Sequence, residues 1–335
     1  MRMSLGNCTV NDDISSWVSA AVWEQLIVCF IGSISNAVSI CCLVRCQRTG
    51  KAVKLQLICI FGLQMTICIA TLPFVTYLYY ADFFCLENGV PKEVQFFFSI
   101  LNSILLQGER LNFTVLAVYR CVAVLCPSKY KKLVITKVVI SLQVGILLII
   151  VPPWIILGIS KGFDFSTMSG SVMRLQFDSG PSFHFVKALY GVYYCLPFII
   201  TFGACAVMMI ALLRHRQRAK GVSVKRKRNM DHIASTIRVV LLTNVLLDGP
   251  HVVFHVLEDF ELASIITHMA FFLHLVLDAA IFVGMNRSYR IELQPKATSC
   301  AVARVPCACL PCCPAEADKE IVIDDVNHIC ATDEP

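Results

Sequence analysis

Long runs of apolar residues, separated by short polar segments, dominate the pattern of this chain. Four runs contain no Asp, Glu, Lys or Arg and are 20, 27, 23 and 26 residues long: 25–44, 55–81, 138–160 and 188–213. Three further apolar segments carry isolated charged residues: 94–119, 239–257 and 262–286. A helix needs about 20 apolar residues to cross the hydrocarbon core of a bilayer. The pattern therefore predicts seven membrane-spanning helices.

The predicted fold is an all-α membrane protein, a seven-transmembrane helix bundle. Backbone inside a bilayer must satisfy its own hydrogen bonds, and segments of this length do so as helices, because barrel strands are about ten residues long. We expect an extracellular tail over 1–21, the helical domain over 22–290 and a cytoplasmic Cys-rich tail over 291–335. A short amphipathic cytoplasmic helix, NRSYRIEL, is expected directly after the seventh helix. The predicted helices run over 22–45, 53–79, 93–125, 134–159, 186–214, 232–257 and 262–285.

Composition agrees with a membrane protein. Hydrophobic residues make up 57% of the 335 residues and charged residues only 16%, and the mean hydropathy is +0.69. An ordinary soluble domain is about 45–50% apolar and about 25% charged. A soluble enzyme, a nucleic-acid-binding protein and a secreted disulfide-rich domain are therefore excluded, and nucleic acid is not an expected partner.

The distribution of basic residues predicts the orientation. With the N-terminus outside, 23 of the 29 Lys and Arg residues fall in or beside cytoplasmic segments, as the positive-inside rule requires. The third cytoplasmic loop, RHRQRAKGVSVKRKR (214–228), holds eight basic residues, so we expect it to contact anionic lipid and a cytoplasmic protein. The polar start MRMSLGNCTVNDDISSW contains no signal peptide, and Asn7 lies in a glycosylation sequon.

Cysteine placement suggests modification on both sides of the membrane. Of the 18 cysteines, Cys8 and Cys85 alone fall in predicted outer segments, so a disulfide in the oxidising compartment has to use them. Cytoplasmic cysteines close to a membrane favour palmitoylation over a zinc site or inert thiols, because a second well-spaced Cys pair is missing. The candidate palmitoylation sites are Cys300, Cys307, Cys309, Cys312 and Cys313.

Several motifs resemble those of rhodopsin-like G-protein-coupled receptors. LAVYRCVAVLCPSKY (116–130) is similar to the family's Asp/Glu-Arg-Tyr motif and its Pro-containing loop, with Arg120 at the arginine. DAAIFVGMNRSYR (278–290) is similar to Asn/Asp-Pro-x-x-Tyr, with Asp278, Phe282 and Asn286 at the matching spacing. Asn36 matches the helix 1 asparagine, and helices 2, 5 and 6 carry the family prolines Pro73, Pro197 and Pro250. The resemblance implies an activation switch formed by Tyr119, Arg120, Asp278, Phe282 and Asn286.

The chain also departs from the family pattern. Tyr119 replaces the acid that pairs with the arginine in the family, which implies high basal activity. Gln64 stands at the position of the family's sodium-binding aspartate, and the family's helix 3 disulfide cysteine is replaced by Gln95. The resemblance implies a plasma-membrane receptor that passes an extracellular signal to a heterotrimeric G protein and to arrestin, and not an enzyme.

Two residue features limit the ligand. Asn102 occupies the position at which amine receptors carry aspartate, which argues against a biogenic amine. No lysine lies in 262–286, so retinal cannot be held there as a Schiff base. The ligand-pocket candidates are Asn102, Ser103, Leu106, His251 and His255.

Ionisable residues inside the membrane are costly and usually functional. Glu109 lies about three helical turns before Arg120, so both side chains share the face that points into the bundle in the family. A polar core is predicted from Asn36, Gln64, Glu109, His274 and Asp278. Its carboxylates could bind a sodium ion or a proton that controls activation, or the cluster could simply fix the packing.

Arg110 needs a different partner, because neighbouring residues on a helix point about 100° apart. Arg110 lies ten residues above Arg120, and Asp248 lies ten residues above Arg238, so both lie about 15 Å from the inner membrane edge. We predict a buried salt bridge between Arg110 and Asp248 that locks helices 3 and 6 together.

Two other functional classes remain open. His251 and His255 have the i, i+4 spacing of zinc ligands, and together with His274 and Asp278 they could serve a seven-helix metal hydrolase. A transporter or channel would also use charged residues inside the membrane.

Overall fold

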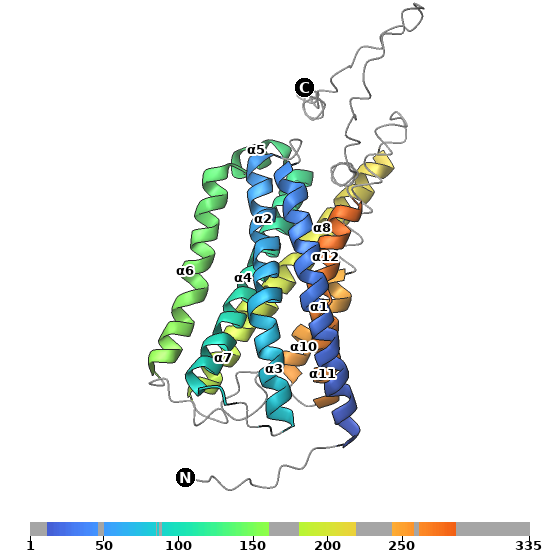
Figure 1. Cartoon of the computed structure of the whole chain (residues 1–335). Helices are drawn as coiled ribbons and strands as arrows, with labels where there is room; N and C mark the ends of the chain where they lie inside the picture. Colours follow the sequence, from blue (N-terminus) through green and yellow to red (C-terminus); the bar gives the residue numbers. More distant parts are fainter. Residues whose placement is uncertain are drawn as a thin grey trace, which may run out of the picture. The chain divides into compact units, whose positions relative to one another are not determined.

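The computed structural model describes residues 12–45, 50–84, 86, 89–160, 181–218, 243–257 and 261–285. Within these ranges the chain forms helices and turns, with no strand. The helices lie side by side along one long axis, and the chain reverses direction between successive long helices (Figure 1). The elements, in chain order, are α1 (Asp12–Arg45), α2 (Lys51–Thr66), η1 (Ile67–Thr71), α3 (Leu72–Phe83), α4 (Lys92–Leu125), α5 (Pro127–Leu133), α6 (Thr136–Ser160), α7 (Pro181–Tyr190), η2 (Gly191–Cys195), α8 (Leu196–Arg218), η3 (Asn244–Asp248), α10 (Gly249–Leu257), α11 (Glu261–Phe272) and α12 (His274–Met285).

Several helices could cross a membrane, which supports a multi-pass membrane protein. Five stretches are long and apolar enough by length and composition: Ile14–Arg45, Lys51–Ala81, Thr136–Ile159, Lys187–Ala211 and Leu262–Met285. Helix α4 is 34 residues long but carries Glu109 and Arg110 near its middle, which lowers its hydropathy. The predicted sixth span is described only from residue 243 onward.

The helix boundaries differ from the prediction at three places. Helix α1 begins at Asp12, ten residues before the predicted start, so the predicted tail over 1–21 is too long. Val18 and Ala21 explain the extension, because they are buried against Tyr79 and Ile265. Helix α7 likewise begins earlier than predicted, and the short helix α5, which starts at a proline, was not predicted at all.

Three π-helical segments interrupt the long helices, and each ends two residues before a proline. The prolines are Pro73 after η1, Pro197 after η2 and Pro250 after η3. A proline has no N–H to donate, and its ring clashes with the carbonyl group one turn earlier. A local widening into π-helix relieves this clash and redirects the side chains on the turn. One of the redirected residues is Asp248, the last residue of η3.

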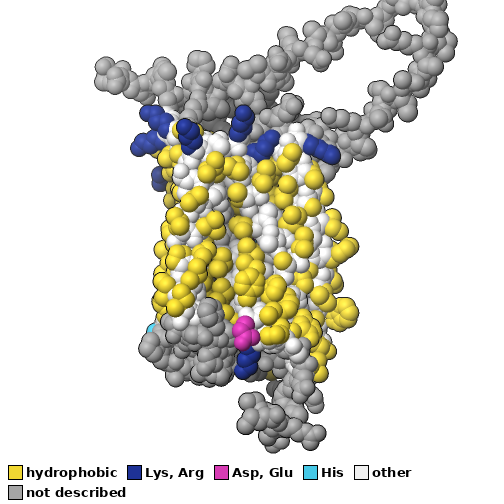
Figure 2. Space-filling view, turned by 60° about the vertical axis from the view of Figure 1, so that its left-hand side comes forward, with side chains coloured by type: hydrophobic (Ala, Val, Ile, Leu, Met, Phe, Trp, Pro, Cys, Tyr) yellow, Lys and Arg dark blue, Asp and Glu magenta, His cyan; other side chains and the backbone are white. Residues whose placement is uncertain are grey.

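The bundle has an apolar surface and a partly polar interior, the distribution expected of a protein surrounded by lipid. Five large apolar side chains on three different membrane-spanning stretches are more than 60% exposed: Trp23, Phe30, Leu148, Ile159 and Ile199. Figure 2 shows the apolar side chains as a broad belt, with Lys and Arg gathered at the end where α5 lies. Exposed basic residues at the ends of α1, α2, α5 and α6 are Arg45, Lys51, Lys129, Lys132 and Lys137.

Candidate functional site: an ionisable cluster in the bundle core

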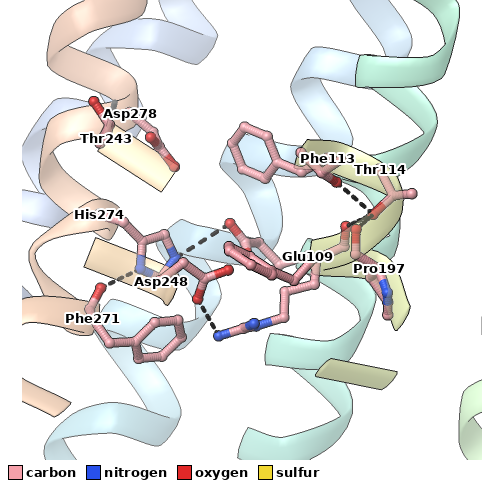
Figure 3. Close-up of a pocket in the computed structure, with 12 residues that line it drawn as sticks. Glu109, Phe113, Thr114, Pro197, Thr243, Asp248, Phe271, His274 and Asp278 are labelled. Carbon is pink, nitrogen blue, oxygen red and sulfur yellow. Dashed lines mark hydrogen bonds and ion pairs between the residues drawn. The ribbon is translucent and has the colours of Figure 1, made fainter. Parts of the chain in front are cut away.

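Four polar residues from three separate segments meet in the core of the bundle. The Gln64 amide nitrogen on α2 donates to Glu109 Oε1 on α4 at 3.0 Å and to Asp278 Oδ2 on α12 at 3.2 Å. His274 Nε2 on α12 lies 3.4 Å from the same Glu109 oxygen. Gln64 is fully buried, Glu109 is 2% exposed and His274 is 8% exposed. This part of the predicted polar core is therefore present, and Figure 3 shows Glu109 and His274 facing each other.

Asn36, the fifth predicted member of the polar core, links α1 to α12 separately. Its amide nitrogen donates to the carbonyl oxygens of Gly32 at 2.8 Å and Leu275 at 2.9 Å. Ser39 adds a second link one turn further along α1, through the Ala279 carbonyl oxygen at 3.3 Å. Asn36 thus fixes the helix that carries His274 and Asp278.

The predicted ion pair between Arg110 and Asp248 is present, and joins α4 to η3. The two side chains are 5% and 16% exposed, so the pair is largely shielded from solvent. The guanidinium group lies over the rings of Tyr194 and Phe271, 4.6 and 4.8 Å from their centroids. Arg110 also lies 3.2 Å from His251 Nδ1, which therefore accepts. The Asp248 carboxylate, the two aromatic ring faces and the His251 imidazole together stabilise the buried guanidinium group.

A small cavity, with room for only a water molecule or two, adjoins this cluster. Helices α4, α8, α11 and α12 and the η3 segment surround it, and Figure 3 shows the lining residues. The polar residues of the cavity lining are ionisable residues and threonines: Glu109, Arg110, Thr114, Thr201, Thr243, Asp248, His274 and Asp278. The Nε and Nη1 atoms of Arg110 are buried and have no hydrogen-bond partner among the described residues.

The cluster contains more acid than base. Three carboxylates, those of Glu109, Asp248 and Asp278, lie close to one guanidinium group and one imidazole. With Arg110 paired to Asp248, two carboxylates remain beside His274. Because buried charges are stable only when they are compensated, the arrangement favours uptake of a proton or a cation.

Sodium, one of the two expected occupants, fits this donor set poorly. Hard cations prefer oxygen ligands, whereas imidazole nitrogen is a ligand for transition metals. A sodium ion bound between the carboxylates of Glu109 and Asp278 would need oxygen neighbours. Instead, the nitrogen atom His274 Nε2 points at Glu109 in that space. Gln64 presents its amide N–H group, not its oxygen, to both carboxylates.

The predicted switch residues do not form one cluster. Tyr119 is 8% exposed and packs with Ala52 and Val139 in an apolar group, and its hydroxyl has no partner among the described residues. Phe282 packs against Phe61, with ring centroids 5.1 Å apart. Asp278 belongs to the core cluster, Arg120 lies at the far end of α4, and Asn286 is outside the described residues.

Three of the predicted ligand residues, Asn102, Ser103 and Leu106, do not line the cavity, whereas His251 contacts the lining residues Arg110 and Phe271. Asn102 accepts a hydrogen bond from Thr71 at 2.8 Å, and Ser103 donates to the Ser99 carbonyl oxygen. Leu106 belongs to the apolar core beside Phe271. A ligand pocket at these residues stays a prediction, because the described cavity lies further along α4.

Of the residues proposed for a metal hydrolase, His274 and Asp278 come together, but His251 is not part of that group. His251 stacks on Phe271 with ring centroids 4.1 Å apart and contacts Arg110, and the side chain of His255 is outside the described part. The group that does bring metal-ligating atoms together is Glu109, His274 and Asp278, whose ligand atoms all lie within 4.8 Å of one another.

Three amide side chains, two of them buried and one partly buried, form a network that the sequence analysis missed. Gln56 on α2 and Gln143 on α6 both donate to the side-chain oxygen of Asn112 on α4, at 2.8 and 2.6 Å. Gln143 also donates to Gln56 Oε1 at 2.9 Å. Gln107 similarly accepts from the Trp154 indole at 3.0 Å. The sequence does contain a signal for this network, namely Gln and Asn residues inside apolar segments, because amide side chains link helices within membranes by hydrogen bonds.

Glu24 on α1 was also missed, since it directly precedes the first uncharged run. Both of its carboxylate oxygens are buried without a hydrogen-bond partner among the described residues.

Several predicted modification sites lie outside the described residues. They are the sequon at Asn7, the disulfide candidates Cys8 and Cys85, the palmitoylation candidates Cys300, Cys307, Cys309, Cys312 and Cys313, and the amphipathic segment after helix α12.

Comparisons with known proteins do not place the chain in a family. No protein-family model matches it, and no curated protein sequence matches it either.

Proposed function

We propose that this protein is a cell-surface receptor of the rhodopsin-like, G-protein-coupled type. An extracellular ligand would shift the helix bundle between two conformations and open a cytoplasmic site for a heterotrimeric G protein, and then for arrestin. The ligand is not a biogenic amine, because Asn102 stands where amine receptors carry aspartate. It is not retinal, because the last helix contains no lysine to form a Schiff base.

The observation that carries the proposal is the convergence of residues from separate motif positions. Gln64 and Asp278 stand at positions that match the family on two separate helices, and the Gln64 amide donates in the core to both Asp278 and Glu109. A bundle whose central charges change partners can occupy two arrangements, and this is what a ligand-operated switch requires. The basic residues at one end of the bundle support a cytoplasmic face there, with the N-terminus outside and the protein in the plasma membrane.

The test is a ligand screen in cells that coexpress a promiscuous G protein. Wild-type protein should give basal or ligand-dependent signalling, and Arg120→Ala, at equal surface level, should abolish it. Leu148→Ala, at an exposed apolar position outside the predicted switch, serves as a comparison that retains coupling. Signalling that is indistinguishable between wild type and Arg120→Ala would refute the proposal.

A transporter is the second candidate, and the buried ionisable cluster is the observation that favours it. Purified protein in sealed liposomes separates the two functions. A flux of protons or cations that needs Glu109 would support transport, and its absence alongside G-protein coupling would support the receptor.

A further inference from the structure

The contact between His274 and Glu109 requires a positive species between the two groups. His274 Nδ1 contacts the Phe271 carbonyl oxygen, which can only accept, so Nδ1 carries the proton. In neutral imidazole the other nitrogen, Nε2, then presents a lone pair. That lone pair faces the carboxylate oxygen of Glu109 at 3.4 Å, and Nε2 has no hydrogen-bond partner among the described residues. Two acceptors face each other in a buried site.

The spacing of His274 Nε2 and Glu109 Oε1 matches two ligands of a single small metal ion. Zinc binds imidazole nitrogen and carboxylate oxygen at about 2.0–2.2 Å in tetrahedral geometry, which places two ligand atoms about 3.3 Å apart. The observed separation of His274 Nε2 and Glu109 Oε1 is 3.4 Å. Asp278 supplies a third ligand atom, and all three lie within 4.8 Å of one another. We propose that Glu109, His274 and Asp278 form a binding site for a divalent transition metal of the zinc class.

The surroundings of the three residues are those of a metal site. A ligating histidine usually donates its second ring N–H to a backbone carbonyl or a carboxylate, and His274 does so to Phe271. Ligating carboxylates are usually held by further hydrogen bonds, and the Gln64 amide holds both Glu109 and Asp278. All three ligands line the cavity, so water can occupy the fourth coordination position.

Charge selects a divalent ion. Asp248 pairs with Arg110, so the deprotonated ligands of a bound metal would carry two negative charges, on Glu109 and Asp278, beside a neutral imidazole. One divalent cation balances these charges. The metal would join α4 directly to α12 in the core of the bundle. The site goes beyond the receptor proposal and does not depend on it.

The experiment is zinc titration of the purified, full-length protein in detergent after removal of metal with a chelator. Thiols in the 18-cysteine chain also bind zinc, so the measured quantity is the difference between variants. His274→Gln should bind about one equivalent fewer than wild type, or bind it at least about tenfold more weakly. His268→Gln is the matched control, because His268 is about as buried as His274 and likewise contacts a backbone carbonyl oxygen, that of Ser264, but is not part of the site. It should bind zinc like wild type.

X-ray absorption at the zinc edge of the wild-type protein gives a test that needs no variant. Bound zinc should include a fraction with nitrogen and oxygen neighbours at about 2.0–2.2 Å. Equal zinc binding by wild type and His274→Gln, or a spectrum with sulfur neighbours alone, would overturn the proposal and would show that a shared proton joins His274 to Glu109. Neither result bears on G-protein coupling.

Discussion

Arg110 and Glu109 illustrate how adjacent charges on one helix serve different partners. Glu109 points toward α2 and α12, where it meets Gln64 and His274, while Arg110 points toward η3 and meets Asp248. The angle of about 100° between neighbouring positions makes this division unavoidable. The sequence therefore indicates which ion pairs cannot form, namely those between adjacent residues of one helix. The depth of each charged residue in the membrane then narrows the choice of its partner.

The Arg110–Asp248 pair should behave as one energetic unit. Asp248→Asn leaves a buried guanidinium group uncompensated, which typically costs about 3–5 kcal/mol. We expect low surface expression and a lower unfolding temperature in detergent. Arg110→Gln added to Asp248→Asn should recover much of the loss, because the remaining charge is then removed. If the effects of the two single changes simply add in the double variant, the two residues are not coupled.

Tyr119 offers a test of the altered arginine motif. The family resemblance implies that Tyr119→Asp supplies the missing acid beside Arg120 and lowers basal signalling. Tyr119→Phe is the control, because the hydroxyl has no partner among the described residues and its removal should leave stability unchanged within about 1 kcal/mol. Basal signal should be compared at equal surface protein. An undiminished signal from Tyr119→Asp contradicts the role given to Tyr119.

At the scale of elements, close approach of α1 to its neighbours depends on one glycine. A Cβ atom at Gly32 would lie 2.7 Å from the Cys68 sulfur and 3.7 Å from the Leu275 carbonyl oxygen. The same turn of α1 carries the Asn36 hydrogen bond to Leu275, so a larger residue would push α1 away from α12. Small residues at helix contacts are a common feature of membrane bundles.

Gly32→Leu should therefore lower the unfolding temperature in detergent, since it separates the two helices and breaks the Asn36 bond. Gly62→Ala is the matched control, because nothing lies within 4 Å of a Cβ atom there. It should be neutral or stabilise α2 by up to about 1 kcal/mol, the cost of glycine within a helix. Equal losses in the two variants would show that the contact at Gly32 has no special role.

The molecule as a whole combines an apolar belt, a basic end and a polar core. A bilayer stabilises the belt, and phosphate headgroups stabilise the basic end. The polar core is stable only because its groups satisfy one another. These three features together favour an orientation with the basic end in the cytoplasm.

Glycosylation can test this orientation directly. With the N-terminus outside, Asn7 carries a glycan, and glycosidase treatment of protein from cells should reduce its apparent mass. Asn7→Gln should remove this change, whereas the buried sequon at Asn112 should contribute none. A glycosidase-insensitive protein whose N-terminal tag is accessible only after permeabilisation would reverse the assigned orientation.

Periodicity and charge in the sequence determined the helical class, the apolar segments and the basic end, because each is a local property of the chain. Spacing along a helix also predicted the Arg110–Asp248 pair. The meeting of Gln64, Glu109, His274 and Asp278 was expected from spacing together with the packing of the family that the chain resembles. Only the tertiary structure decided the Gln56–Asn112–Gln143 network, the early start of α1 and the atom of His274 that faces Glu109. These features depend on which side chains of neighbouring helices come into contact. The packing between helices determines those contacts, and the order of residues within one helix does not.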